Sequence, residues 1–372
     1  MHRQMAPILN NQRGIALLVC LAIISVLSAA GLELGKRVRR STDLTIALQA
    51  NFRATEMAMA GIHLAMVILE EDANANDIDS IQEIWADPEV INGAIASLGF
   101  PSGQMTLSIV DELGKIQVNA LLDKFPGNTF NNDQKELWER LLDLMISADK
   151  SQDERDPSEI INSLKDWLDS EDDDLETGTS GAESAYYQDL VPPYTCSNGP
   201  FDLLEELFLV KGLSLGLQAS ETLEGLDDTS LGFQETFTVF GMDDTVTEKN
   251  RYQFPGLINI NTANALVLMA LLPPGMEDQA QELVDFRVQK HEEKGDYLNA
   301  LDKGWYKEIV GLSDTEEKRF DRLITYSSNF FRVVCSVTMG EKEHRVTAVI
   351  QRKKGEETNR WGCRIIRILR NQ

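Results

Sequence analysis

The longest uncharged and mainly apolar run of this chain lies near its N-terminus. Residues 15–32 are 18 consecutive residues without a charge, and an α-helix needs roughly 20 apolar residues to cross a bilayer. No other stretch of the sequence comes near this length. The pattern therefore predicts one membrane-spanning helix, preceded by a polar leader at residues 1–14.

Helical periodicity continues beyond the membrane run. Apolar residues recur at helical spacing between residues 44 and 69, and no proline interrupts them. Gly31, Gly35 and Gly61 are the weak positions along the way. We expect one helix over residues 15–71, about 85 Å long at about 1.5 Å per residue, lying partly in lipid and partly in a soluble domain. A coiled-coil dimer is the alternative, but no heptad pattern persists.

Alternation at period two predicts strands early and late in the chain. Residues 105–119 alternate on both sides of a turn at residues 111–114, which predicts a β-hairpin. Residues 329–352 predict a second hairpin around Gly340, and residues 361–369 a third C-terminal strand. Amphipathic helices are expected between them, at residues 134–147, 159–168 and 277–292. The expected class is α+β, with a long helix on an antiparallel sheet and a large helical insert.

The charge of the chain limits its partners. Its formal net charge is -25 and its pI is about 4.5, which argues against nucleic acid, because nucleic-acid affinity requires Lys and Arg at the phosphates. Residues 166–189 hold nine acidic residues and no basic ones. Such a segment is most often a solvated linker, but its oxygens also suit Ca2+, which takes six to eight oxygen ligands. The spacing of an EF-hand is absent.

Four cysteines leave the disulfide state open. Cys20 lies in the membrane run and is interpreted as a small apolar residue. Cys196, Cys335 and Cys363 lie beyond it, so at least one of the three has no partner within the chain. Cys335 and Cys363 both fall in strand-like segments, and an oxidising compartment would allow a disulfide between them. The sequence does not choose among the three pairings.

The flanks of the membrane run give conflicting signals on orientation. Arg13 and Gly14 precede the run, while Lys36, Arg37, Arg39 and Arg40 follow it. The positive-inside rule therefore favours a cytoplasmic C-terminal domain. However, Arg13-Gly14 before an apolar helix resembles a type IV prepilin leader, which prepilin peptidase cuts after the glycine while the helix is retained. We give the leader more weight, which places the cleavage between Gly14 and Ile15. An ordinary uncleaved anchor is the alternative.

Motifs further along resemble general secretion pathway protein K, a large minor pseudopilin of type II secretion systems. They are Asp-Glu-x-Gly-Lys-Ile-x-Val-Asn at residues 111–119, the acidic segment that ends in Gly-Ala-Glu-x-x-Tyr-Tyr at residues 181–187, and Asn-Ile-Asn-Thr-Ala at residues 259–263. They follow the order of the family. The resemblance implies a type IV pilin-like fold: leader 1–14, transmembrane helix 15–35, soluble helix and first strands 36–121, helical insert 122–328 with acidic loop 166–189, and C-terminal strands 329–372.

The resemblance also implies a calcium site. The acidic segment is similar to the calcium-binding loop of the family, which makes Asp169, Glu171, Asp172 and Glu183 the candidate ligands. Glu171 stands where the family has an aspartate.

Two other classes of function are weaker. Asn-Ile-Asn-Thr-Ala followed by a helix, capped by Asn261 or Thr262, is also how helix-hairpin-helix modules of membrane-anchored DNA-binding competence proteins begin. In those modules a Gly-hydrophobic-Gly turn faces phosphate, whereas the turn here carries Glu277 and Asp278, which repel it. The four histidines show no metal-ligand spacing, and nucleophile and phosphate-loop motifs are absent, so we do not expect an enzyme.

The function that the resemblance implies is that of a minor pseudopilin, acting in protein export across the outer membrane. Its anchor would lie in the inner membrane and its head in the periplasm, and leader cleavage and methylation would precede assembly. Its partners would be minor pseudopilins of the I and J types, the major pseudopilin and prepilin peptidase. Most pilins carry glutamate at the fifth mature position, where it pairs with the N-terminal amine of a neighbour. Here that position is Val19, so we expect this subunit at the tip of the pseudopilus.

Overall fold

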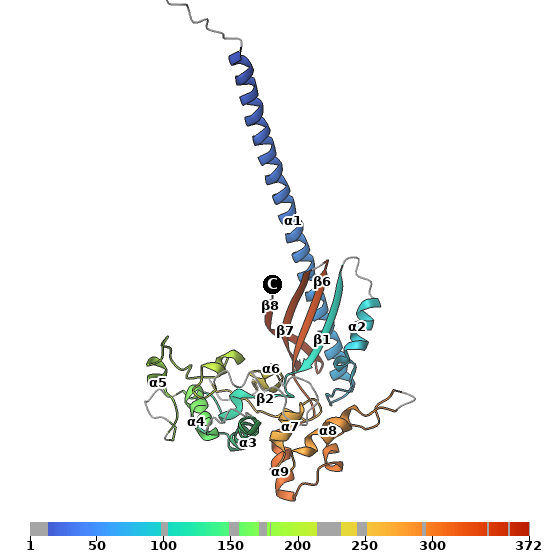
Figure 1. Ribbon diagram of the computed structural model, residues 1–372. Coiled ribbons are helices and arrows are strands. Elements are labelled where there is room, and N and C mark those ends of the chain that lie inside the picture. The colour runs from blue at the N-terminus through green and yellow to red at the C-terminus, as the bar shows by residue number, and fades with distance from the viewer. Residues whose placement is uncertain are drawn as a thin grey trace, which may run out of the picture.

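A long helix that projects from a compact head dominates the molecule (Figure 1). The structure, a computed structural model, describes residues 14–97, 103–148, 156–170, 177–178, 180–213, 232–243, 251–291, 295–340, 342–355 and 358–371. Helix α1 (Ile15–Ala75) has 61 residues, which corresponds to about 92 Å. The single helix predicted from periodicity is confirmed, and the three glycines do not interrupt it.

The two halves of α1 have different surroundings. Its apolar beginning is long enough to cross a membrane and is entirely exposed. Its second half packs on the sheet through residues that lie on one side of the helix, and most of them are small. They are Ala54, Ala58, Gly61, Ile62, Ala65, Leu69 and Ala73. Small side chains let the helix axis approach the sheet closely, so the head is fixed to the rod along about 30 Å.

The sheet has four antiparallel strands in the order β1-β6-β7-β8. They are β1 (Gln104–Asp111), β6 (Phe330–Met339), β7 (Lys342–Lys354) and β8 (Trp361–Asn371). The predicted C-terminal hairpin and third strand are confirmed. One face of the sheet packs on α1, and α2 (Pro88–Ser97) and the 3-10 turn η2 (Ile84–Ala86) complete that core beside β1.

The predicted hairpin at residues 105–119 is wrong. β1 pairs with β6, more than two hundred residues later, while β2 (Ile116–Gln117) pairs in parallel with β3 (Phe237–Thr238). The amide of Leu113 donates to the Asp111 side chain, and the carbonyl of Leu113 accepts from the amide of Asn259. The turn is therefore held by a distant segment, and the chain leaves the sheet there and enters a second body.

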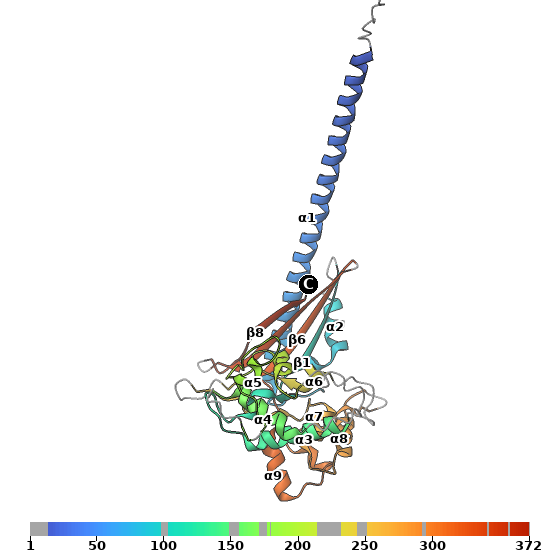
Figure 2. The same ribbon diagram turned by 60° about the vertical axis from the view of Figure 1, so that its left-hand side comes forward.

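The second body is helical and has its own core, which extends from Ile116 to Ile324. It lies at the end of the sheet farthest from the apolar beginning of α1 (Figure 2). Its helices are α3 (Asn132–Ala148), α4 (Pro157–Leu168), α5 (Ser184–Gln188), α6 (Phe233–Thr236), α7 (Ala265–Leu271), α8 (Asp278–Val288) and α9 (Asp314–Leu323), with 3-10 turns η3 (Val118–Leu121), η4 (Leu204–Leu209) and η6 (Trp305–Glu308). A short parallel pair, β4 (Ile258–Asn259) and β5 (Ile324–Thr325), lies beside the sheet domain. The α+β architecture with a helical insert is thus confirmed.

Gly61 tests the close packing of α1. A Cβ atom added there would lie 2.7 Å from Cys335 Sγ and 3.0 Å from Met105 Sδ, whereas one added at Gly93 in α2 meets nothing within 4 Å. We expect Gly61→Ala to lower the free energy of unfolding by roughly 1–3 kcal/mol through overpacking. Gly93→Ala, the matched control, should raise it by roughly 0.5–1 kcal/mol. Thermal unfolding of the two variants measures this difference, and a stabilising Gly61→Ala would contradict the packing described.

Candidate functional site

The acidic segment predicted from sequence begins on α4. An Asp156 cap and Pro157 in the first turn start this helix, and Trp167 and Leu168 bury its end in the helical body. Asp166 and Asp169 lie one turn apart, so they project from the same side of the helix end. Both are buried.

The chain then folds back over Asp166. The backbone amide of Thr177 donates to Asp166 Oδ1 at 3.1 Å and that of Ala182 to Asp166 Oδ2 at 2.8 Å. Gly181 passes so close that any side chain there would collide with the Asp166 carboxylate. This return brings Glu183, the residue before α5, beside the two aspartates.

Three carboxylates therefore meet in one buried site. Asp166, Asp169 and Glu183 each offer an oxygen within 4.8 Å of the others, and all three side chains are buried. Lys165 places its Nζ 3.0 Å from Asp169 Oδ2, and Lys211 donates from Nζ to the carbonyl oxygens of Ser180 and Gly181 beside the site. Buried carboxylate oxygens gathered in this way suit a hard cation such as Ca2+. The residues present thus fit that ion.

Aromatic side chains next to the three carboxylates pack this segment against the core of the helical body. Trp167 stacks on Phe201 with ring centroids 6.0 Å apart, and Tyr187 meets the Trp167 edge at 5.2 Å. The hydroxyl of Tyr187 accepts from the amide of Lys211 at 3.2 Å, and burial raises the pKa of this tyrosine above its ordinary range. Tyr187 therefore packs the loop, and the chain around the carboxylates is anchored to the core.

The structure brings together part of the predicted ligand set. Asp169 and Glu183 share the site, whereas Glu171 and Asp172 lie outside the described residues. Asp166 is a third member that the sequence analysis missed. Asp166 is three residues before Asp169, at the end of the helix predicted over residues 159–168, and this spacing could have indicated that both lie on one side of the helix.

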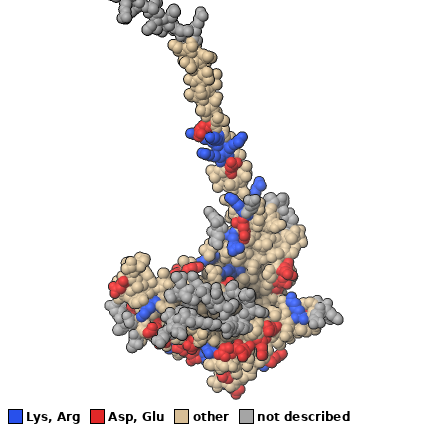
Figure 3. Space-filling model, viewed as in Figure 1, with Lys and Arg blue, Asp and Glu red and all other residues tan. Residues whose placement is uncertain are grey.

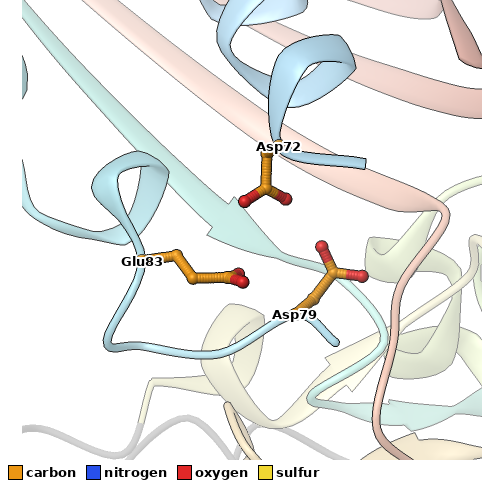
Figure 4. A group of neighbouring side chains, drawn as sticks. All are labelled: Asp72, Asp79 and Glu83. Carbon is orange, nitrogen blue, oxygen red and sulfur yellow. The ribbon is translucent and has the colours of Figure 1, made fainter. Parts of the chain in front are cut away.

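A second acidic group lies where the sheet domain meets the helical body (Figure 4). Asp72 at the end of α1, Asp79 in the following loop and Glu83 offer oxygens within 4.8 Å of one another. Arg352 of β7 enters this group, with Nη2 at 2.7 and 2.6 Å from the two Asp79 oxygens and Nη1 at 3.2 Å from Asp72. The Arg352 side chain is only 4% exposed. We call these four residues the joint.

The joint is connected to two of the sequence motifs, one in each body. Asn259 donates from Nδ2 to the backbone oxygen of Asp79 at 3.0 Å and to Asp111 Oδ2 at 2.8 Å. Thr262 donates to the same Asp111 oxygen at 2.7 Å. Asp79 also accepts from the amide of Ser328 at 2.7 Å. The motifs at residues 111–119 and 259–263 thus form one buried contact between the helical body and the sheet.

This contact corrects the capping role given to Asn261 and Thr262. Asn261 accepts a hydrogen bond from the indole of Trp305 at 2.7 Å, and Asn264 caps α7 by accepting from the amide of Val267 at 2.9 Å. The side chains of Asn259, Asn261 and Thr262 thus make hydrogen bonds within the protein.

Burial shifts the ionisation of the joint and its surroundings. Burial, together with the charges of Glu83 and Asp79, raises the pKa of Asp72 to about 7, against the opposing effect of Arg352. Burial also raises the pKa of Glu83 from its ordinary value. The pKa of Asp111 rises to about 6, again because of burial. Asp72, Glu83 and Asp111 therefore hold their protons more tightly than exposed carboxyl groups do.

The remaining predicted residues belong to neither group. Gly14 is exposed and Ile15 begins α1, while the preceding leader residues lie outside the described part of the chain. The disulfide between Cys335 and Cys363 is not formed. Strand β7 lies between the two thiols, and their partners on it, Val346 and Arg352, are six residues apart, far beyond the reach of a disulfide.

Comparison with known proteins gives similarity in both sequence and fold. The family models described as "Type II secretion system (T2SS), protein K" match residues 114–220 and 258–303. Type II secretion system protein K of Pseudomonas aeruginosa is 24% identical over 93% of this chain and 90% of that protein. The putative protein K of Escherichia coli K12 is 27% identical over 55% of this chain, and the chain spans only 59% of that relative's length.

A solved structure shares the fold. The crystal structure of the GspK–GspI–GspJ complex from enterotoxigenic E. coli contains a chain that superposes with a TM-score of 0.59 at 16% identity. The match covers 88% of this chain and 99% of that one.

The joint predicts a pH dependence of stability. Because the pKa of Asp72 is about 7 in the folded protein and near 3.8 when unfolded, its contribution is full below about pH 4 and is lost as the pH rises through 7. Asp72→Asn should flatten part of the fall in melting temperature between pH 5 and 8. Asp77→Asn, at an exposed position nearby, is the control. An unchanged pH profile of Asp72→Asn would show that this carboxyl does not titrate in that window.

Proposed function

We propose that this chain, a protein-K-like pseudopilin by sequence and fold, is a minor pseudopilin of a type II secretion system and acts in protein export across the outer membrane. The observation that carries the proposal is α1: one unbroken helix whose exposed apolar part fits a single-pass anchor and whose second half is the backing of a sheet. We further infer that the protein acts by binding other proteins and not by catalysis.

The proposed location is the inner membrane, with the head in the periplasm. Cleavage between Gly14 and Ile15 would leave the apolar part of α1 at the mature N-terminus, followed by methylation there. Basic side chains gather on α1 directly beyond its apolar part (Figure 3), at residues 36–40. They would lie at the head-group level of the membrane, where Lys and Arg stems can snorkel.

The proposed partners are other minor pseudopilins of the I and J types, the major pseudopilin and, for processing, prepilin peptidase. In the solved complex GspK is accompanied by GspI and GspJ, which supports the first of these. An apolar stripe on the exposed stalk of α1 offers the surface: Leu34, Val38, Leu44, Leu48 and Phe52 are all exposed and fall on one side of the helix. Such a stripe, here called the stalk stripe, suits the α1 helices of neighbouring subunits.

The proposed position is the tip of the pseudopilus. Val19 provides no carboxylate for the terminal amine of another subunit, and burying that amine in lipid without a counter-charge is costly. The helical body also lies across the end of the sheet domain away from the membrane (Figure 2), where a following subunit would have to pack.

We also propose a structural Ca2+ at the site of Asp166, Asp169 and Glu183. Their buried oxygens fit the ion, and Glu171 and Asp172 stay candidate ligands. When bound, Ca2+ would neutralise the carboxylates and tie the end of α4 to the start of α5. No nucleic-acid role is proposed, because the net charge of -25 repels phosphate.

The stalk stripe provides the test of the assembly role. In the mature chain that begins at Ile15, Leu48→Asp should reduce co-isolation with I- and J-type pseudopilins at least about tenfold, since burying a leucine contributes roughly 1.5–3 kcal/mol. Ile46→Asp is the matched control: Ile46 is 60% and Leu48 59% exposed, but Ile46 points away from the stripe. Neither variant should change the melting temperature of the head. Equal co-isolation of the two variants would count against the proposal.

Calcium titration tests the metal site. We expect millimolar Ca2+ to raise the melting temperature, with a stabilisation of about 1.4 kcal/mol at ten times the dissociation constant. Asp169→Asn and Glu183→Gln should abolish the effect, whereas Asp189→Asn, an exposed acid of the same segment, should retain it. If Ca2+ raised the melting temperature of these two variants as much as that of the unmodified protein, the ion would bind elsewhere.

A further inference from the structure

Strand β8 leaves one edge of the sheet open. It is the last strand in the order β1-β6-β7-β8 and has 11 residues. Near its start the amide of Cys363 donates to Glu70 Oε1 at 2.7 Å. From Ile365 onward its outer edge has no strand partner among the residues described. A long open edge is a template on which another chain can add a strand.

Apolar side chains of β8 are exposed to solvent. Ile366 is 39% and Leu369 51% exposed, so apolar surface reaches solvent there. A register shift opposite Val349 and Ile350 places Arg364 and Arg367, three residues apart, on the same face of the sheet, the face away from α1. Leu369 lies on that face as well. The edge thus presents two arginines in line with one leucine.

The charge of this region is opposite to that of the chain. Residues 342–371 contain nine Lys and Arg against three Glu, a formal net charge of +6 in a chain of -25. Arg367 donates to the backbone oxygen of Asp202 and stacks on Phe240 at 5.2 Å, and it meets no carboxylate within the described part of the chain. An incoming strand with acidic side chains would be complementary to this edge.

A groove continues the same surface. It has a volume of about 360 Å³ and lies between the outer face of the sheet and the helical body. Arg367 and Leu369 form one wall, and Leu203 and Phe240 form part of the other. Side chains of an added strand that point away from α1 would enter this groove.

The position of β8 suggests which molecule supplies the strand. From the contact between Glu70 and Cys363, β8 and α1 run toward the membrane side by side, and the C-terminus lies beside α1 where the helix leaves the head (Figure 1). Eight strand residues cover about 26 Å, the length of about 17 helical residues, so β8 ends level with Arg53. The stalk stripe ends at Phe52, directly beyond. A neighbour packed on the stripe therefore brings its head to this edge.

We propose that the open edge of β8 binds an extended acidic segment of a neighbouring minor pseudopilin, which adds a fifth strand to the sheet. This rests on the proposed function. A second copy of this chain is disfavoured, because pairing β8 with itself would bring the arginines of both strands together.

Photo-crosslinking of the full mature chain in cells that make its pseudopilin partners tests the proposal. A photo-reactive amino acid in place of Leu369 should form an adduct with an I- or J-type pseudopilin, at least about tenfold above the same probe in place of Leu298, an exposed leucine of the helical body. The crosslinked peptide should map to an extended acidic segment. Arg367→Glu, and Arg364→Glu as the second variant, should lower the yield at least fivefold, whereas Lys318→Glu on α9 should not.

A probe in place of Leu48 separates the two proposals. If Leu48 crosslinks to a pseudopilin and Leu369 does not, the strand addition is wrong and the assembly role stands. If neither position crosslinks, the assembly role fails and the strand addition fails with it. A crosslinking yield at Leu369 that is unchanged in the Arg364→Glu and Arg367→Glu variants would also overturn the proposal.

Discussion

The buried contact between Arg352 and Asp79 is the constraint on which the rest of the head depends. Both side chains are almost fully buried, and Arg352 also donates to the last turn of α1 through the backbone oxygen of Leu69 at 3.1 Å. One guanidinium therefore ties together the end of the long helix, the loop after it and the end of β7, a central strand of the sheet. Removing either partner would leave a buried charge without compensation, which typically costs about 3–5 kcal/mol. The helical body is held to the same point through Asn259.

The two halves of α1 are suited to different environments, an apolar one and the packed core of the head. The first part of α1, which is long and apolar enough to cross a membrane, satisfies its backbone internally and carries no charged side chain over residues 15–32. In the head, small residues such as Ala58 and Gly61 bring the same helix close to the sheet. The joint lies at the end of α1, so the rod, the sheet and the helical body are linked at one point.

The sequence could predict those features that depend on residues close together in the chain, and not those that depend on contacts between distant segments. The long helix and the hairpin around Gly340 were predictable because periodicity is a local property. The strand pairing of residues 104–111 was not, because its partner β6 lies across the whole insert. The predicted cap at Asn261 or Thr262 was wrong for the same reason: Asn264 caps the helix, and Asn261 is bonded to Trp305, more than forty residues away. Asp169 and Glu183 were found through a family motif, whereas Asp166 needed the fold of the returning loop.

Charge is segregated along the molecule in a way that favours one orientation. The basic residues of the stalk follow the apolar part of α1 directly (Figure 3), and the sheet that carries the basic strands β7 and β8 lies between the stalk and the helical body (Figure 1). In the proposed location, anionic lipid head groups would attract the basic residues of the stalk and repel the acidic excess of the rest of the chain. A head with this distribution would stand off the bilayer with its helical body outermost. In the proposed assembly, that posture would leave the stalk and the edge of β8 accessible to neighbouring subunits and would place the helical body outermost.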